Sequence, residues 1–181
     1  MSAAAQQRLG LLLAAEGGLI ATLLEPGSEE RETPAPAGAD PARLAAEGPR
    51  TRAQADEYEL LVEAIYEGYL LHYGSPRVVR APEEDLKVLA GDQLYAIGLA
   101  RLVALGDTAA VAELADTITL SALAQGAGEP RLAEAVWAAG ARAVGWGSSD
   151  AHRRAKDLAF AGAPEAFEAM RTSAEGAAAS P

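Results

Sequence analysis

Alanine constrains the fold of this chain more than any other residue, because 44 of the 181 residues are alanine. Alanine has the highest helix propensity and is too small to fill the pleated surface of a sheet. The chain has only two Phe and two Trp, so few large side chains are available for a broad sheet interface. We therefore expect an all-α protein that folds as an antiparallel helical bundle.

Charge and composition exclude several classes of function. The formal net charge of −11 opposes binding to nucleic acid, which requires Lys and Arg facing phosphate. The chain has no cysteine and two histidines, His72 and His152, so we expect no disulfide, no metal site and no cofactor. The apolar stretch 9–24 is interrupted by Glu16 and is too short to span a membrane. We expect no transmembrane segment, no signal peptide and a cytoplasmic location.

Turn-forming residues divide the chain into four parts. We expect an N-terminal helix over 1–24, weakened at Gly17–Gly18, and a Pro/Gly/Glu-rich linker over 25–50 with a short helix at Pro41–Glu47. A helical-bundle domain should cover 51–172, followed by a disordered tail over 173–181.

Capping residues predict the helices of the bundle domain. Thr51 is a predicted N-cap for a helix that ends at Tyr73, and Asp107 for a helix through Leu123. Pro130 and Pro164 suit first turns, and Ser148 or Ser149 suits another N-cap.

Charged clusters are expected to face water. Glu59, Glu63 and Glu67 form a like-charged ladder one helical turn apart. The basic run from His152 to Lys156 could meet phosphate or an acidic partner, but a solvated face or an internal pair with acidic residues explains it as well.

Gly91 and Asp92 oppose local helix propensity in the middle of a strongly apolar helical stretch. Such violations mark packing or functional constraints. One explanation is a close helix crossing at Gly91, with Asp92 bonded to a neighbour. A second explanation comes from the surrounding residues, which read Leu-Ala-Gly-Asp-Gln-Leu-Tyr from Leu89 to Tyr95.

This heptapeptide resembles the Gly-Asp helix of trans-polyprenyl diphosphate synthases. The similarity extends over roughly residues 58–125, and Leu70-Leu71-His72 resembles the end of the family's preceding helix. The family's Asp-Asp-x-x-Asp motifs, which hold magnesium against an allylic diphosphate, are absent from the sequence, and His72-Tyr73 stands where paired arginines are expected. The resemblance implies part of the isoprenoid synthase fold without catalysis by this chain alone.

The departures are similar to those of the noncatalytic small subunits of two-component heptaprenyl diphosphate synthases. The resemblance implies an accessory protein that binds a protein partner, with a catalytic prenyl synthase subunit and an isoprenoid ligand as the candidates. The expected contact residues are Tyr66, Tyr69, Tyr73, Gly91, Asp92 and Tyr95, and no catalytic residue is expected. The alternative is an unrelated all-α adaptor whose apolar groove accepts a partner helix. A metal-dependent enzyme using Glu63 and Glu67 ranks third.

Overall fold

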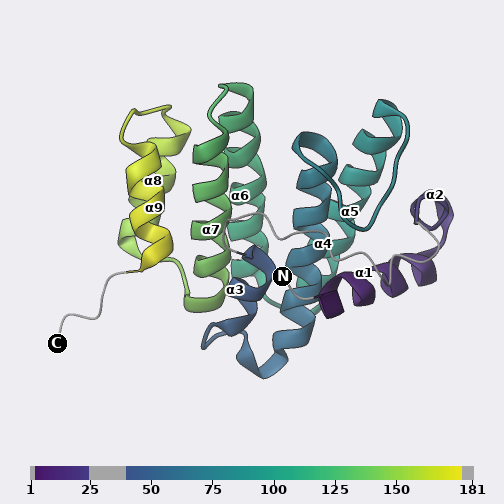
Figure 1. Ribbon diagram of the computed structural model, residues 1–181. Coiled ribbons are helices and arrows are strands. Elements are labelled where there is room, and N and C mark those ends of the chain that lie inside the picture. The colour runs from purple at the N-terminus through teal and green to yellow at the C-terminus, as the bar shows by residue number, and fades with distance from the viewer. Residues whose placement is uncertain (1–2, 25–39, 177–181) are drawn as a thin grey trace.

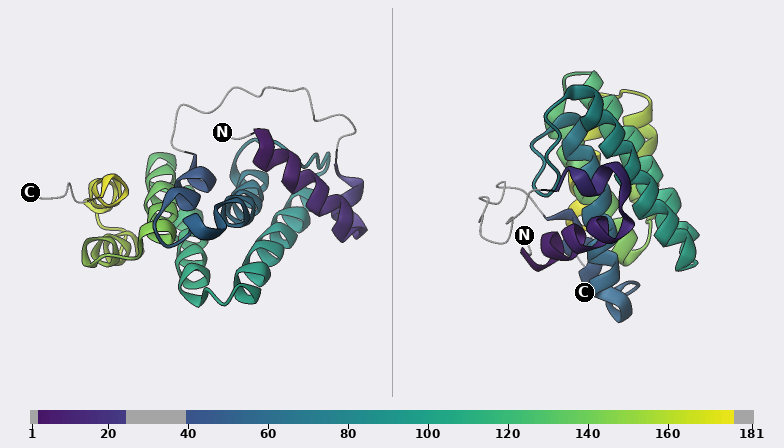
Figure 2. Two further views of the ribbon diagram at one scale, coloured as in Figure 1. Left: turned by 90° about the horizontal axis from the view of Figure 1, so that it is seen from below. Right: turned by 90° about the vertical axis from the view of Figure 1, so that its right-hand side faces the viewer.

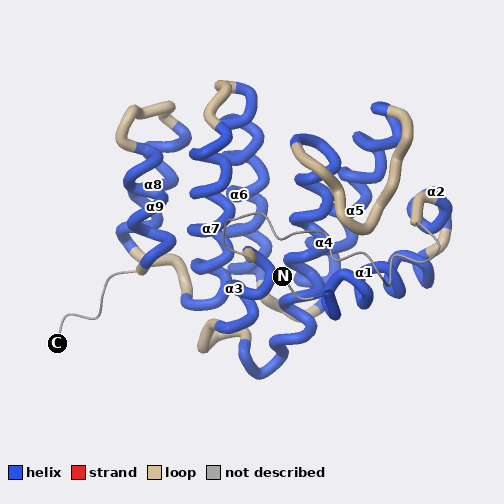
Figure 3. Tube along the Cα trace, viewed as in Figure 1, coloured by secondary structure: helices blue, strands red, loops and turns tan. Residues whose placement is uncertain are grey.

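The structure is a computed structural model that describes residues 3–24 and 40–176. Every regular element within these residues is a helix, apart from one isolated β-bridge between Leu24 and Val79, which confirms the all-α prediction (Figure 3). The α-helices are α1 (Ala3–Glu16), α2 (Gly18–Thr22), α3 (Pro41–Glu47), α4 (Ala55–Tyr73), α5 (Glu84–Ala104), α6 (Thr108–Gly126), α7 (Pro130–Trp146), α8 (Asp150–Phe160) and α9 (Ala166–Glu175), with a 3₁₀ turn, η2, at Arg52–Gln54. Across the part of the chain described, no helix is both long and apolar enough to cross a bilayer.

Three helical hairpins, α4–α5, α6–α7 and α8–α9, stand side by side (Figure 1). Helices α5 and α6 meet at the turn over 105–107 and diverge from it (Figure 2). Side chains of α4 and α7 meet in the core, where Tyr66 contacts Trp137.

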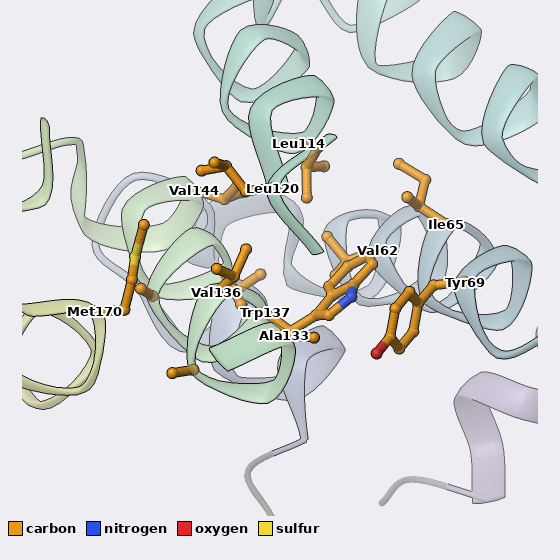
Figure 4. Close-up of a cluster of buried hydrophobic side chains, with 14 of the residues drawn as sticks. Val62, Ile65, Tyr69, Leu114, Leu120, Ala133, Val136, Trp137, Val144 and Met170 are labelled. Atoms are coloured by element: carbon orange, nitrogen blue, oxygen red, sulfur yellow. The ribbon is translucent and has the colours of Figure 1, made fainter. Parts of the chain in front are cut away.

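The main core lies between α4, α6 and α7 (Figure 4). Trp137 of α7 is 2% exposed and is the largest fully buried side chain. It packs among apolar residues that α4 and α6 direct inward, including Val62, Ile65 and Leu114. Alanines such as Ala133 supply the remaining contacts, which is how an alanine-rich chain brings its helices close together.

Helix α3 packs between the first two hairpins, because its alanines contact both α4 and α7. Asp40 caps the helix by accepting a hydrogen bond from the Arg43 backbone N–H at 3.3 Å. After α3, Gly48 lies so close to Gly145 of α7 that a Cβ atom at either position would meet backbone atoms. The segment expected as a linker over 25–50 therefore contains the expected helix at 41–47 as part of the core. Residues 25–39 lie outside the described residues.

The N-terminal helix expected over 1–24 is two helices, since the chain breaks at Gly17, whose φ is +71°. Helices α1 and α2 bury Leu9, Leu13 and Ile20 in a second apolar cluster with side chains of α4 and α5. In Figure 1, α1 runs crosswise to α4. The N-terminal segment therefore packs on the rest of the protein.

Most of the predicted helix ends are confirmed. Asp107 accepts from the Ala110 N–H at 3.0 Å, Ser149 accepts from the His152 N–H at 3.1 Å, and Pro130 occupies the first position of α7. The N-cap at Thr51 is wrong. The Thr51 hydroxyl donates instead to the Ala45 carbonyl at 2.6 Å, and α4 begins only at Ala55.

The last helix differs from the expected boundaries at both ends. Helix α9 begins at Ala166 rather than at Pro164. It continues to Glu175, so residues 173–175 of the expected disordered tail are helical. Residues 177–181 lie outside the described part of the chain.

Candidate functional site

A row of aromatic rings crosses the molecule from α7 through α4 to α5. Trp137 of α7 contacts Tyr66 and Tyr69 of α4, with ring centroids 4.9 and 5.3 Å away. Tyr69 contacts Tyr73 at 5.5 Å. His72 continues the row to α5, because it lies 5.8 Å from Tyr73 and stacks on the ring of Tyr95 at 5.4 Å. The fold therefore brings together all four tyrosines predicted as contact residues.

Most of this row belongs to the core. Tyr69 is 6% exposed, whereas Tyr73 is 45% exposed. Burial raises the pKa of the Tyr66, Tyr69 and Tyr95 hydroxyls, so the buried rings stay protonated at neutral pH. A partner can therefore reach the row mainly at Tyr73, where α4 ends.

Gly91 and Asp92 form the close crossing of α4 and α5. A Cβ atom on Gly91 would lie 2.5 Å from Nε2 of His72 and 3.1 Å from the Gly68 carbonyl oxygen. The missing side chain thus lets His72 lie across α5. There His72 Nε2 is 3.3 Å from a carboxylate oxygen of Asp92. The predicted close helix crossing at Gly91 is therefore confirmed. Asp92 lies near His72 without a hydrogen bond to it, and its side chain is 67% exposed, so the expected bond from Asp92 to a neighbour is not found there. The role of Gly91 and Asp92 toward a ligand stays a prediction.

The glutamate ladder does not face water, and that prediction is wrong. Glu63 is 2% exposed and Glu67 is fully buried. The loop after α4 returns over them and places Arg77 with its Nη2 atom 2.8 Å from Glu63 and its Nε atom 3.5 Å from Glu67. The Arg77 guanidinium also lies 5.0 Å from the centre of the Tyr66 ring.

Glu67 fixes this loop by accepting three backbone hydrogen bonds. One carboxylate oxygen accepts from the N–H groups of Arg77, Val78 and Val79 at 2.7, 2.6 and 3.1 Å. Glu63 lacks such bonds, and its burial, only partly offset by Arg77, raises its pKa to about 7. The two carboxylates are therefore committed to internal partners.

A second buried polar cluster joins α6, α8 and α9. His152 lies 2.6 Å from Glu113 through Nε2 and 2.8 Å from the Ser173 hydroxyl through Nδ1. Lys156 donates to Glu113 at 3.1 Å and to Asp116 at 2.7 Å. Burial opposes the charge on Glu113, but the hydrogen bonds from His152 and Lys156 outweigh it and hold its pKa below the usual value.

This second cluster has the connectivity of a nucleophile, base and acid, but its surroundings do not suit catalysis. Ser173 lies in the last turn of α9, where the carbonyl end of the helix dipole opposes an oxyanion. The cluster instead holds three helices together. Within the basic run after His152, Lys156 belongs to this cluster through its acids on α6, whereas Arg153 bonds to Asp150 on the exposed side of α8.

Beyond the exposed Glu84 and Asp85 in the first turn of α5, helices α5 and α6 present an exposed surface that is mostly apolar. We call it the α5–α6 face, and its exposed residues are Val88, Leu89, Asp92, Ala96, Ala100, Val103, Thr108, Ala112, Ala115, Thr119 and Leu123. Val88, Leu89, Val103 and Leu123 are 49%, 55%, 57% and 52% exposed. Asp92 is the one charged residue in this set. Other charged side chains of the same helices are exposed or half-exposed, namely Glu84, Asp85, Arg101 and Asp116. The sequence showed that the helical stretch around Gly91 and Asp92 is strongly apolar but gave no sign that part of it stays uncovered.

In residues 3–24 and 40–176, no three His, Cys, Asp or Glu side chains are grouped so that they could hold a metal ion. Comparison with protein-family models, with curated proteins and with solved structures gave no match. The resemblance to polyprenyl synthases therefore depends on the residues of this chain alone.

Proposed function

We propose that this chain is a noncatalytic, polyprenyl synthase-like accessory subunit that binds a protein partner through the α5–α6 face. The observation that carries the proposal is the exposure of large apolar side chains on two successive helices. Large apolar side chains that stay exposed are typical of surfaces that bind another protein. A catalytic prenyl synthase subunit is the partner that the Gly-Asp helix favours.

The energetics of the α5–α6 face support a docking role. Val88, Leu89, Val103 and Leu123 are each about half exposed, so covering them completely would contribute roughly 1 kcal/mol apiece. The alanines between them would allow a partner helix to approach closely. Asp92 lies within the face and can pair with a cation on the partner.

The buried carboxylates support a noncatalytic role. Glu63 and Glu67 are the two acids of α4 that a metal-dependent enzyme would use. Glu63 already pairs with Arg77, and Glu67 already accepts hydrogen bonds from the loop backbone. An acid that is held in this way cannot join a magnesium–diphosphate cluster without breaking the loop. An isoprenoid chain could contact the aromatic row mainly at Tyr73, the most exposed ring of the row.

The test is to mix the purified chain with a catalytic long-chain prenyl synthase subunit and measure association and product chain length. We expect a complex, which Leu89→Asp and Val103→Asp each weaken about tenfold or more because a charge is buried in the contact. Phe160→Asp is the matched control, since Phe160 is 48% exposed on α8, outside the α5–α6 face. Equal binding by all three variants would contradict the proposed surface.

A specific observation favours the alternative, an all-α adaptor that accepts a partner helix. A lipid-binding tunnel between α4 and α5 would require open space near Leu60 and Leu94. Leu9 and Leu13 of α1 instead belong to the same buried cluster as those two residues. Capture of one defined partner that is not a prenyl synthase, with the same sensitivity to Val103→Asp, would support the adaptor.

A further inference from the structure

The surface under α1 and α2 has the properties of a helix-binding groove. It is lined by Leu60, Ala64 and Leu71 of α4 and by Ala90 and Leu94 of α5, all buried. The loop residues Val78 and Val79 belong to the same buried cluster. The groove is therefore apolar along its base and is built from three segments.

Helix α1 shows what this groove accepts. Leu9 and Leu13, four residues apart, are both fully buried, whereas Leu11 on the opposite side of α1 is 67% exposed. Only one face of the helix is thus used. Arg8 stands next to the first leucine and pairs with Asp56 at 2.8 Å and with Glu59 at 2.6 Å on α4.

The buried contacts of α1 come from one side of the helix, where Ala5, Leu9 and Leu13 recur every four residues. In and after α2, Ile20 and Leu23 are buried, and Leu24 packs on the same cluster and forms the bridge with Val79. The Leu23 carbonyl accepts a backbone hydrogen bond from Arg80 at 2.8 Å, and Glu16 lies 3.9 Å from Arg101. In sequence, only residues 25–39 connect this segment to α3. These features are typical of a helix bound in a groove rather than of a central core element.

We infer that the groove between α4 and α5 is a helix-binding site, occupied in this structure by the chain's own N-terminal segment. Its partner is an amphipathic helix from another protein that carries an arginine directly before the first of two leucines spaced four residues apart. Such a helix replaces α1 by making the same ion pairs with Asp56 and Glu59. This inference gives the adaptor function a specific site and does not depend on the α5–α6 face.

The ion pairs of Arg8 allow a test in the full-length chain, with a labelled peptide of residues 3–24 as the probe. Arg8→Glu places a third acid beside Asp56 and Glu59, so it should release α1 without altering a core residue. We expect the peptide to bind the Arg8→Glu chain about tenfold more tightly than the wild-type chain. Arg43→Glu is the control, because Arg43 pairs with Glu47 on the exposed side of α3.

A charge exchange tests the orientation of the bound helix. The full-length chain carrying Asp56→Arg and Glu59→Arg should prefer a peptide with Arg8→Glu over the wild-type peptide by about tenfold. Hydrogen exchange should show that Arg8→Glu exposes α1 and α2 while α4 to α7 stay protected. Failure of the Arg8→Glu chain to bind the peptide, or loss of protection in α4 together with α1, would overturn the inference.

Discussion

Changing Glu63 to glutamine should remove a large part of the pH dependence of stability near neutrality. In the folded protein the pKa of Glu63 is raised from 4.5 to about 7. With Glu63 protonated, the buried charges of Arg77 and Glu67 balance each other. Ionising Glu63 adds a second negative charge beside the one arginine.

The sign and size of the effect follow from this pKa. The folded pKa lies above the unfolded value, so the contribution of Glu63 to stability is fully present below pH 4.5 and is lost as the pH rises through about 7. A rise from 4.5 to about 7 corresponds to about 3 kcal/mol. For a domain of this size that is roughly 6–12 °C in Tm.

The assay is urea denaturation, followed by circular dichroism, at several pH values from 5 to 8. The wild-type chain should lose up to about 3 kcal/mol of unfolding free energy across this range through Glu63, and Glu63→Gln should lose much less. Glu59→Gln is the matched control, one turn earlier on α4, where the carboxylate pairs with Arg8 near the surface. If Glu63→Gln kept the wild-type slope, the argument from burial would be refuted.

Three further changes test the packing and the second polar cluster. Gly91→Ala should cost about 1–3 kcal/mol because its methyl group meets His72, whereas Gly126→Ala, with nothing within 4 Å, should be neutral or stabilising; thermal melts of both variants check this. Glu113→Gln should lower stability at pH 7 and remove the loss that wild type shows as the pH falls below about 4.5, because the folded pKa of Glu113 lies below its usual value; acid titration of unfolding measures this. Trp137→Ala should cost about 3–5 kcal/mol in denaturant unfolding, and a cost below 1 kcal/mol would contradict its central place in the core.

Local signals in the sequence were sufficient to predict the helices and several of their ends. Asp107, Ser149 and Pro130 lie where capping chemistry places them, and each interaction spans only a few residues. Gly91 could also be assigned to a close helix crossing, because a glycine in a good helix requires a reason. Local chemistry and the final fold agree at these positions.

The buried polar groups could not be predicted, since their partners come from distant segments. The glutamates of α4 share one face, but the sequence does not show that Arg77 and the following loop return to cover it. His152 and Glu113 are 39 residues apart. A like-charged ladder is exposed by default, and only a tertiary contact reverses that expectation. The α5–α6 face was not predicted either. An apolar stretch of sequence does not reveal which of its side chains stay exposed in the folded protein.

The position of α3 has a consequence for folding during synthesis. Helix α3 spans residues 41–47 and packs on α7, which spans residues 130–146. On the ribosome, α4 and α5 can pair early, but α3 has to wait for α7 before its second surface is covered. A seven-residue helix is too short to persist alone in water, so the final closure of the core should coincide with its docking.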